Sequence, residues 1–190
     1  MTGQEDSMIE VRFHGRAGQG AVTSAELMAL TAISGGKYAQ AFPNFGPERR
    51  GAPVTAYLRI SEAPIRVREK VYNPNVVVVL DPSIMKVMKV DAGLREDGFL
   101  IINSTKPAAE IRKTFGFKQK IATVDALHIA LEELGVPITN TVMMGSLSKV
   151  TGMATPDQVR GPLDDRFGPN LAPKNLKAFE RAYESTKMEG

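Results

Sequence analysis

The sequence predicts an α/β fold: a Rossmann-like, doubly wound sheet that is mixed but mostly parallel, with an antiparallel hairpin and helices on both faces. Three observations favour it. The stretch Ile9–Ser34 changes from strand periodicity to helix periodicity across a glycine-rich turn. Residues 76–80 form the apolar run VVVVL, typical of a strand buried on both faces. The alternating stretch Val54–Ile60 turns and returns through Ile65–Val67, which predicts the hairpin.

The first strand and helix enclose a loop that carries Gly15, Gly18 and Gly20. Glycines permit positive φ, so backbone amides can converge on an anion, and the helix that follows adds the positive end of its dipole. Arg16 supplies a guanidinium that can hold a phosphate or a carboxylate. The loop is therefore interpreted as a ligand or partner contact, with a tight strand-to-helix turn that binds nothing as the alternative.

Two standard nucleotide-binding patterns fit this loop poorly. The glycine order is G-x-x-G-x-G instead of G-x-G-x-x-G, and no acidic residue near Phe42 is placed to hold a ribose. Gly15 and Gly20 have P-loop spacing, but Ala21 and Val22 replace the Lys and the Ser or Thr. These departures disfavour dinucleotide binding and ATP hydrolysis.

Composition bounds the function further. The length of 190 residues fits one domain, and the net charge of +3 is too small to indicate nucleic-acid binding. The chain has no cysteine, which excludes cysteine-ligated iron–sulfur clusters and thiol nucleophiles. Its two histidines, His14 and His128, are far apart in sequence. No apolar run is long enough for a membrane span and no signal peptide is recognisable, so we expect a cytoplasmic protein.

A second segment with functional character runs from Pro43 to Pro53 and follows a strand predicted at residues 37–42. Its prolines and glycines forbid regular structure, yet it carries large and charged side chains: Phe45, Glu48, Arg49 and Arg50. A Phe beside paired Arg is typical of interfaces, so the segment is a candidate contact loop, with a solvated loop as the alternative. The basic residues of the predicted hairpin, Arg59, Arg66, Arg68 and Lys70, are interpreted as a solvated face.

Polar residues follow the two buried strands of the middle region. Asp81 and Pro82 fit the N-cap and first position of a helix that extends to Val90. The next strand is predicted at residues 99–102. At the ends of these strands lie four weak site candidates, for which helix capping is the favoured interpretation: Asp81, Asn103, Ser104 and Thr105.

The C-terminal half is predicted to be mainly helical. A short edge strand at 120–123 precedes a helix at 124–134, in which His128 is expected to be a packed or interface residue. The next helix, 140–150, is apolar nearly all round and should be buried, with Gly145 at a close contact.

Thr155 and Gln158 form a capping box for a further helix. Residues 160–173 are predicted to be an extended, exposed arm, followed by a C-terminal helix at 174–187 with an apolar face. The chain is thus expected to be a single domain over residues 1–190 with a loose N-terminus at 1–7.

The chain lacks a recognisable catalytic inventory. No triad, metal cluster or carboxylate pair for acid–base chemistry stands out. A subunit that completes the active site of another protein has this appearance, and so does a stand-alone ligand binder.

Four segments together resemble one family. FHGRAGQGAVT at 13–23, FGPERRGAPV at 45–54, VVVVLDPS at 76–83 and the stretch 139–145 are similar to the γ subunit of 2-oxoacid:ferredoxin oxidoreductases, of which the pyruvate enzyme is the best known. The resemblance extends from Ile9 to Phe179. Ala17 departs slightly, because many members carry Gly there.

The resemblance implies a complex that oxidatively decarboxylates a 2-oxoacid, forms an acyl-CoA and reduces ferredoxin. Thiamine diphosphate, Mg²⁺ and [4Fe-4S] clusters would belong to companion α, β and δ (ferredoxin-like) subunits, with no cofactor bound by this chain alone and no autonomous activity. The residues implied to contact CoA or a neighbouring subunit are Gly15, Arg16, Gly18, Gln19, Gly20, Phe45, Glu48, Arg49, Arg50 and Asn140.

Two alternatives stay open from the sequence. One is a stand-alone module that binds CoA or a nucleotide. The other is a γ-type subunit of a 2-oxoglutarate, branched-chain, indolepyruvate or phenylglyoxylate oxidoreductase.

Overall fold

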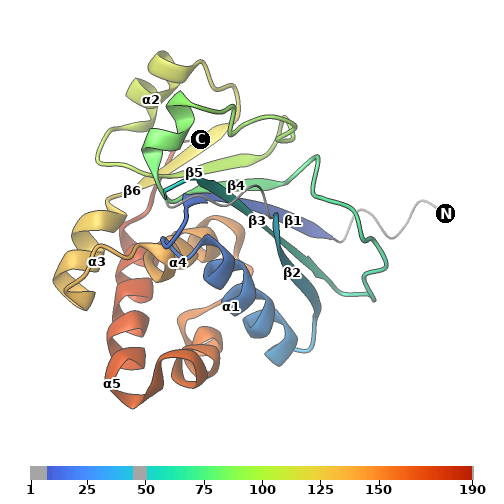
Figure 1. Cartoon of the computed structure of the whole chain (residues 1–190), viewed down its shortest axis with the longest axis vertical. Helices are drawn as coiled ribbons and strands as arrows, with labels where there is room; N and C mark the ends of the chain where they lie inside the picture. Colours follow the sequence, from blue (N-terminus) through green and yellow to red (C-terminus); the bar gives the residue numbers. More distant parts are fainter. Residues whose placement is uncertain (1–7, 45–50, 190) are drawn as a thin grey trace.

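One mixed sheet organises the molecule. The computed structural model describes residues 8–44 and 51–189. Its sheet has seven strands in the order β2-β3-β1-β4-β5-β6-β7 (Figure 1). The strands are β1 (Ile9–Arg16), β2 (Tyr38–Asn44), β3 (Pro53–Ser61), β4 (Val76–Val79), β5 (Phe99–Asn103), β6 (Lys120–Val124) and β7 (Lys187–Met188).

The strand directions confirm the predicted mixed, mostly parallel sheet. β1, β4, β5 and β6 are parallel neighbours. β3 is antiparallel to both β1 and β2, and β7 is antiparallel to β6. The predicted hairpin is wrong in its second strand, because residues 62–70 contain no strand. Both edges of β3 are already paired with β1 and β2, so the returning segment has no free edge to join.

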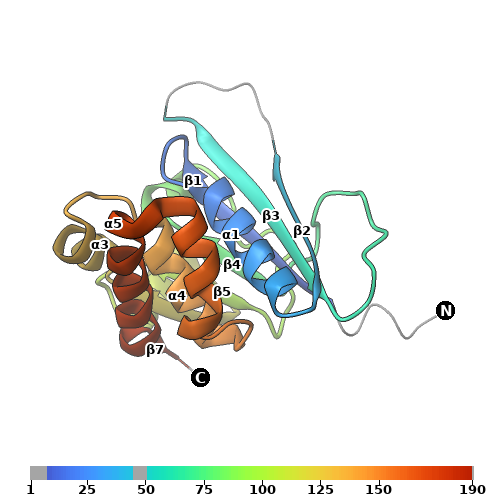
Figure 2. The ribbon, with the colours of Figure 1, turned by 90° about the horizontal axis from the view of Figure 1, so that it is seen from below.

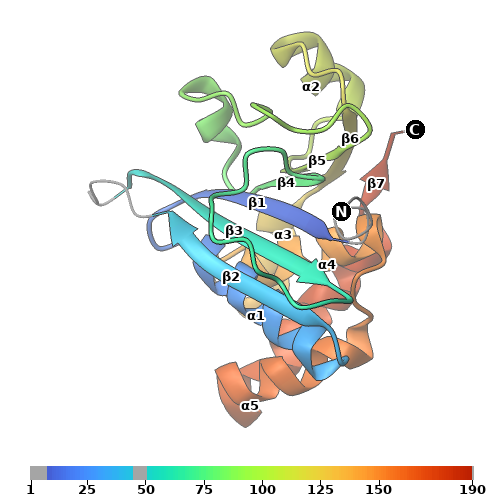
Figure 3. The same ribbon diagram turned by 90° about the vertical axis from the view of Figure 1, so that its right-hand side faces the viewer.

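Helices cover both faces, as Figures 1 and 3 show. One face carries α1 (Ala21–Ser34), α3 (Ala126–Leu134), α4 (Asn140–Thr151) and α5 (Pro156–Ser185); the other carries the 3₁₀ helix η1 (Pro82–Lys86) and α2 (Ala108–Phe115). The structure has a hydrophobic core on each face of the sheet, and strand β4 contributes to both. Val76 and Val78 belong to the core beneath α1 and α4, whereas Val77 and Val79 pack with Ile84 of η1 in the second core. The apolar run therefore has the two buried faces that its sequence predicts.

Helix α4 lies at the centre of the larger helical layer, and most of its side chains are buried. Its polar side chains bond to α5: the Thr141 hydroxyl donates to Asn175 Oδ1 (2.7 Å), and Ser146 Oγ accepts from the Thr186 hydroxyl (2.8 Å). At Gly145, an added Cβ would lie 2.2 Å from the Phe179 carbonyl oxygen. The predicted close contact is confirmed, and its partner is the backbone of α5.

The predicted exposed arm at 160–173 is wrong. This segment is helical within α5, and Leu163 and Ala172 are buried in the main core. The helix breaks only at Gly168 (φ 69°, ψ 177°), and Pro169 begins the next helical stretch, where a missing N–H costs little. Prolines therefore mark a bend between two packed helical segments. The capping box of Thr155 and Gln158 is confirmed.

Three further expectations need correction. The helix after Asp81 is only the short η1, and β7 covers β6, so β6 is not an edge strand. Arg59 is 1% exposed and donates to Glu10 Oε1 (2.7 Å), so it is not part of a solvated face. His128 lies on the exposed side of α3 near Glu132, so of its two predicted roles, packed residue or interface residue, only the interface role stays a prediction. Helix α2 was not anticipated.

Among residues 8–44 and 51–189, no helix has both the length and the apolar character that crossing a membrane requires.

The contact at Gly145 generates a stability prediction. We expect Gly145→Ala to lower the free energy of unfolding by about 1–3 kcal/mol, because the new methyl group must push α4 away from α5. Gly161→Ala is the matched control: it lies in α5 with nothing within 4 Å of an added Cβ. That change should raise the stability by about 0.5–1 kcal/mol. Urea unfolding measures both, and equal effects would contradict the close contact.

A candidate site at the carboxyl edge of the sheet

The β1–α1 loop lies at the edge where the parallel strands end. The pairing of Arg16 with Pro53 and of Asn44 with Thr55 brings the loop, the end of β2 and the start of β3 to the same end of the sheet (Figure 2). Gly18 and Gly20 have φ values of 92° and 81°. An added Cβ at Gly20 would lie 2.8 Å from Asn140 Nδ2, whereas at Gly18 it would meet nothing within 4 Å. Gly20 thus allows contact with α4, and Gly18 faces open space.

Arg16 is held by a dense set of hydrogen bonds. Its Nε donates to Asp81 Oδ2 (3.1 Å), its Nη2 to Ser83 Oγ (2.8 Å) and its Nη1 to the Gly51 carbonyl (2.8 Å). Gln19 closes the arrangement, because its Nε2 donates to Asp81 Oδ2 (2.9 Å) and its Oε1 accepts from the Arg16 amide (2.6 Å). We call Arg16, Gln19, Asp81 and Ser83 the Arg16 clamp.

The clamp changes the role of Arg16. Its guanidinium is paired with a carboxylate and with the backbone that ends the β2–β3 connection. Ala17 strengthens that link by donating its amide to the Ala52 carbonyl (3.1 Å). Arg16 is therefore engaged within the chain, with Asp81, Ser83 and Gly51.

Asp81 is the acceptor at the centre of the clamp. Burial raises the pKa of its carboxyl, but hydrogen bonds from Ser83 and Gln19 and the charge of Arg16 outweigh burial and lower the pKa below its usual value. The carboxylate also caps η1 by accepting from the Ser83 amide (2.9 Å). Sequence reasoning identified the cap but missed the bond to Arg16, which depends on the parallel pairing of β1 with β4.

Backbone donors remain at the start of α1. The amides of Gly18 and Gly20 have no acceptor within the described part of the chain, and α1 begins without a side-chain cap at Gly20. Open amides at a helix N-terminus suit a phosphate or a carboxylate. Within the described residues, the donors of this loop that lack a partner are therefore backbone amides.

Asn140 lies behind the loop. It is buried against Gly20, and its Oδ1 accepts from the Thr141 amide (2.8 Å) at the start of α4. The structure thus brings together six of the predicted site residues: Gly15, Arg16, Gly18, Gln19, Gly20 and Asn140. The other four, Phe45, Glu48, Arg49 and Arg50, lie outside the described residues, although Gly51 beside them bonds to the clamp.

The polar candidates after β5 have structural roles. Asn103 Nδ2 donates to the Leu80 carbonyl (2.9 Å), and its Oδ1 accepts from the Ala126 amide (3.1 Å). Ser104 Oγ accepts from the Lys106 amide (3.1 Å). The favoured interpretation as caps and turn residues is supported, and Thr105 makes no side-chain hydrogen bond within the described ranges.

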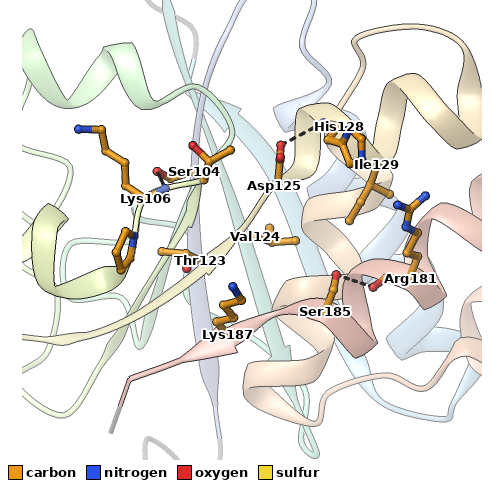
Figure 4. Close-up of a pocket in the computed structure, with 12 residues that line it drawn as sticks. Ser104, Lys106, Thr123, Val124, Asp125, His128, Ile129, Arg181, Ser185 and Lys187 are labelled. Atoms are coloured by element: carbon orange, nitrogen blue, oxygen red, sulfur yellow. Dashed lines mark hydrogen bonds between the residues drawn. The ribbon is translucent and has the colours of Figure 1, made fainter.

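A hollow of about 440 Å³ lies beside β6, between α2 and α5 (Figure 4). Lys106 and Arg181 lie on opposite sides of it. Lys106 pairs with Glu110, and Arg181 pairs with Glu132 (2.5 Å) and Glu133 (2.9 Å). These two cations are paired with neighbouring carboxylates, whereas Lys187, which also lines the hollow, has no ion-pair partner within the described residues.

Two buried polar residues on β1 lie next to the loop. Arg12 donates from Nη2 to the carbonyls of Val90 (2.9 Å) and Ala92 (2.6 Å), and from Nε to His14 Nε2 (3.1 Å). Burial, together with the charge of Arg12, lowers the pKa of His14 to about 3. His14 is therefore neutral at physiological pH and acts as an acceptor that supports the connection between β4 and β5.

Comparison with known proteins defines the class of this α/β chain. It belongs to the pyruvate ferredoxin/flavodoxin oxidoreductase family, whose model matches residues 10–185. It is 52% identical to the pyruvate/ketoisovalerate oxidoreductases common subunit gamma of Pyrococcus abyssi, over 95% of this chain and 98% of that protein.

Two further relatives agree. The pyruvate synthase subunit PorC of Methanothermobacter marburgensis is 50% identical, over 96% of this chain and all of that protein. The crystal structure of the pyruvate oxidoreductase subunit PORC of Thermotoga maritima has a TM-score of 0.86 and 40% identity, and the match covers 97% of this chain and 99% of that one. The predicted resemblance to γ subunits of an oxidoreductase complex is confirmed.

Asp81 is the residue on which the clamp depends. We expect Asp81→Asn to lower the free energy of unfolding at pH 7 by about 1–3 kcal/mol, because the new amide would face the donors of Arg16 and Gln19. The effect should shrink as the pH falls below about 3.8, the ordinary pKa, because the carboxyl of the unfolded chain then takes up a proton before that of the folded chain does. Chemical denaturation measures it, with the exposed Asp157→Asn as control; equal losses would refute the clamp.

His14 gives a pH prediction. Its pKa of about 3 in the folded chain lies below the ordinary 6.5, so the unfolded chain takes up the proton first as pH falls. The contribution of His14 is complete above pH 6.5 and declines toward pH 3, by at most about 1.4 kcal/mol per pH unit. His14→Gln keeps an acceptor for Arg12 but should lose this slope. Parallel stability–pH curves for the two chains would contradict it.

Proposed function

We propose that this chain is the γ subunit of a thiamine-diphosphate-dependent 2-oxoacid:ferredoxin oxidoreductase, which converts pyruvate, CoA and oxidised ferredoxin to acetyl-CoA, CO₂ and reduced ferredoxin, or acts on a related 2-oxoacid. Its role is to support assembly with α, β and δ subunits and to shape the CoA side of the active site. The observation that carries the proposal is the end-to-end match, at about half identity, to proteins named as such subunits.

The donor chemistry of the chain supports placing the redox cofactors elsewhere. An iron–sulfur cluster needs cysteine ligands as a rule, and this sequence has none. Among residues 8–44 and 51–189, no group of three His, Cys, Asp or Glu side chains is arranged to hold a metal ion. The residues present do not fit a resident cluster, so the clusters, thiamine diphosphate and Mg²⁺ are assigned to companion subunits.

The β1–α1 loop is the part of this chain that suits CoA. A phosphate placed at the start of α1 would accept hydrogen bonds from the amides of Gly18 and Gly20, and it would be stabilised by the positive end of the helix dipole. The clamp fixes Gly51, and hence the end of the segment that carries Arg49 and Arg50. This geometry supports a junction at which backbone amides and those arginines meet CoA or a neighbouring subunit.

The names of the relatives suggest two kinds of 2-oxoacid substrate. Pyruvate is the first choice, and a branched-chain 2-oxoacid is the second, because the Pyrococcus relative is named as common to pyruvate and ketoisovalerate oxidoreductases. One γ subunit serving two enzymes would require that substrate choice reside on other chains.

Anaerobic affinity purification of the tagged chain from its native cells tests this proposal. We expect larger companion subunits and the brown absorbance of iron–sulfur clusters in the eluate, with CoA-dependent reduction of ferredoxin by pyruvate or a branched-chain 2-oxoacid. A colourless chain without companions, which binds CoA by itself in calorimetry, would instead favour a stand-alone CoA-binding module.

The arginine pair can be tested in the same complex. We expect Arg49→Ala and Arg50→Ala each to raise the KM for CoA about ten-fold or to reduce the yield of complex, because a charge-assisted hydrogen bond contributes about 1.5–3 kcal/mol. Lys113→Ala, an exposed charge on α2, is the control and should change neither. Unaltered yield and unaltered CoA kinetics in both variants would remove these arginines from the junction.

A further inference from the structure

An apolar groove of about 660 Å³ opens on one side of the Arg16 clamp. It lies between η1, α2 and α3, where β4 and β5 end, and Ser83 of the clamp belongs to its wall. Its apolar lining comes from Pro82, Met85, Ile111, Phe115 and Leu127.

A second hollow, of about 280 Å³, lies on the other side of the clamp and contains Gly18 and Gly20. Its walls come from the α3–α4 connection and from the bend in α5: Val136, Ile138, Phe167 and Leu171. Two cations, Arg166 and Lys174, stand at the same hollow. Neither has an ion-pair partner within residues 8–44 and 51–189.

Helix α3 contributes an exposed apolar row at the same edge. Leu127 and Leu131 are four residues apart, so they share one face of the helix. They are 46% and 48% exposed, although their side chains are large and apolar. Leu127 lines the groove of about 660 Å³, and Val136 and Ile138, which follow α3, line the hollow of about 280 Å³. We call Leu127, Leu131, Val136, Ile138 and Leu171 the apolar edge.

The chemistry of the apolar edge suits a protein better than a small molecule. Ligand sites combine apolar walls with a few free polar groups that fix orientation. In the groove beside η1, the side chains of Ser83 and Asn103 are engaged within the chain, and the open amides of Gly18 and Gly20 line only the smaller hollow. Contiguous exposed apolar side chains with charges at their margin are typical of permanent subunit contacts.

We propose that the apolar edge is the docking surface for a companion subunit of the oxidoreductase complex, which inserts apolar side chains into the two hollows and places carboxylates against Arg166 and Lys174. This inference rests on the proposed function, because it names the surface by which the γ subunit joins its complex. It also sets the docked subunit directly against the β1–α1 loop.

Charge favours a companion over a second copy of this chain. A two-fold dimer would place the apolar edge against itself and would bring a second pair of cations, Arg166 and Lys174, into the same contact. Like charges in a desolvated contact cost free energy, whereas acidic groups on a different chain would complement them.

Co-expression with the companion subunits tests the surface. We expect Leu131→Asp and Leu171→Asp each to reduce the companion subunits recovered with the tagged chain at least ten-fold. Ile33→Asp is the matched control: Ile33 and Leu171 are both 51% exposed, and Ile33 lies near the other end of α1. That variant should assemble like the parent chain. Thermal unfolding of each isolated variant confirms that the changes act on docking and not on folding.

The two cations at the margin of the apolar edge, Arg166 and Lys174, are tested by reversing their charges. Arg166→Glu with Lys174→Glu should weaken assembly, and added salt should weaken assembly of the parent chain. Normal recovery of companions with both aspartate variants would overturn the proposal. So would a homodimer of the isolated chain that Leu171→Asp dissociates, because the edge would then bind a second copy. Absence of companions from the parent chain would count against the proposed function itself.

Discussion

The bond between Arg16 and Asp81 holds together the candidate site at the carboxyl edge of the sheet. It joins the ends of β1 and β4, the two parallel strands at the centre of the sheet, and it fixes Gly51 at the same point. Gln19 donates to the same carboxylate and Ser83 Oγ accepts from Arg16, so the β1–α1 loop, the start of the 3₁₀ helix and Gly51 are joined at one point. Rigid hydrogen-bonded loops of this kind present backbone donors in a fixed direction.

Close backbone contacts supply the second constraint. Gly20 lies against the side chain of Asn140, and Gly145 lies against the carbonyl of Phe179, so the start of α1 and the end of α5 both approach α4 closely. This packing buries the start of α4 behind the β1–α1 loop and leaves α3 and the bend in α5 at the surface. The result is an edge of the sheet that combines open amides with exposed apolar side chains, as expected for a subunit whose chemistry is shared with other chains.

Much of the fold could be predicted from local patterns. The change of period at Gly15–Gly20, the run VVVVL and the capping box at Thr155 each depend on residues close in sequence, and each is confirmed. The wrong predictions concern segments whose structure depends on strand pairing or core packing with residues distant in sequence. Residues 65–67 form no strand because β3 already has two neighbours, and residues 160–173 are helical because Leu163 and Ala172 reach the main core. No local signal in a Pro- and Gly-rich segment reports such burial.

The sequence alone determined the class of protein: two glycine-rich segments at a fixed separation identify the family, and the absence of cysteine leaves this chain without the usual ligands of an iron–sulfur cluster. It also located the β1–α1 loop, because glycine is the residue that such a turn requires. Only the tertiary structure decided what Arg16 does, since its partners Asp81 and Ser83 are brought to it by the parallel pairing of β1 and β4. Whether a charged side chain is free or paired depends on neighbours distant in sequence, and the fold chooses those neighbours.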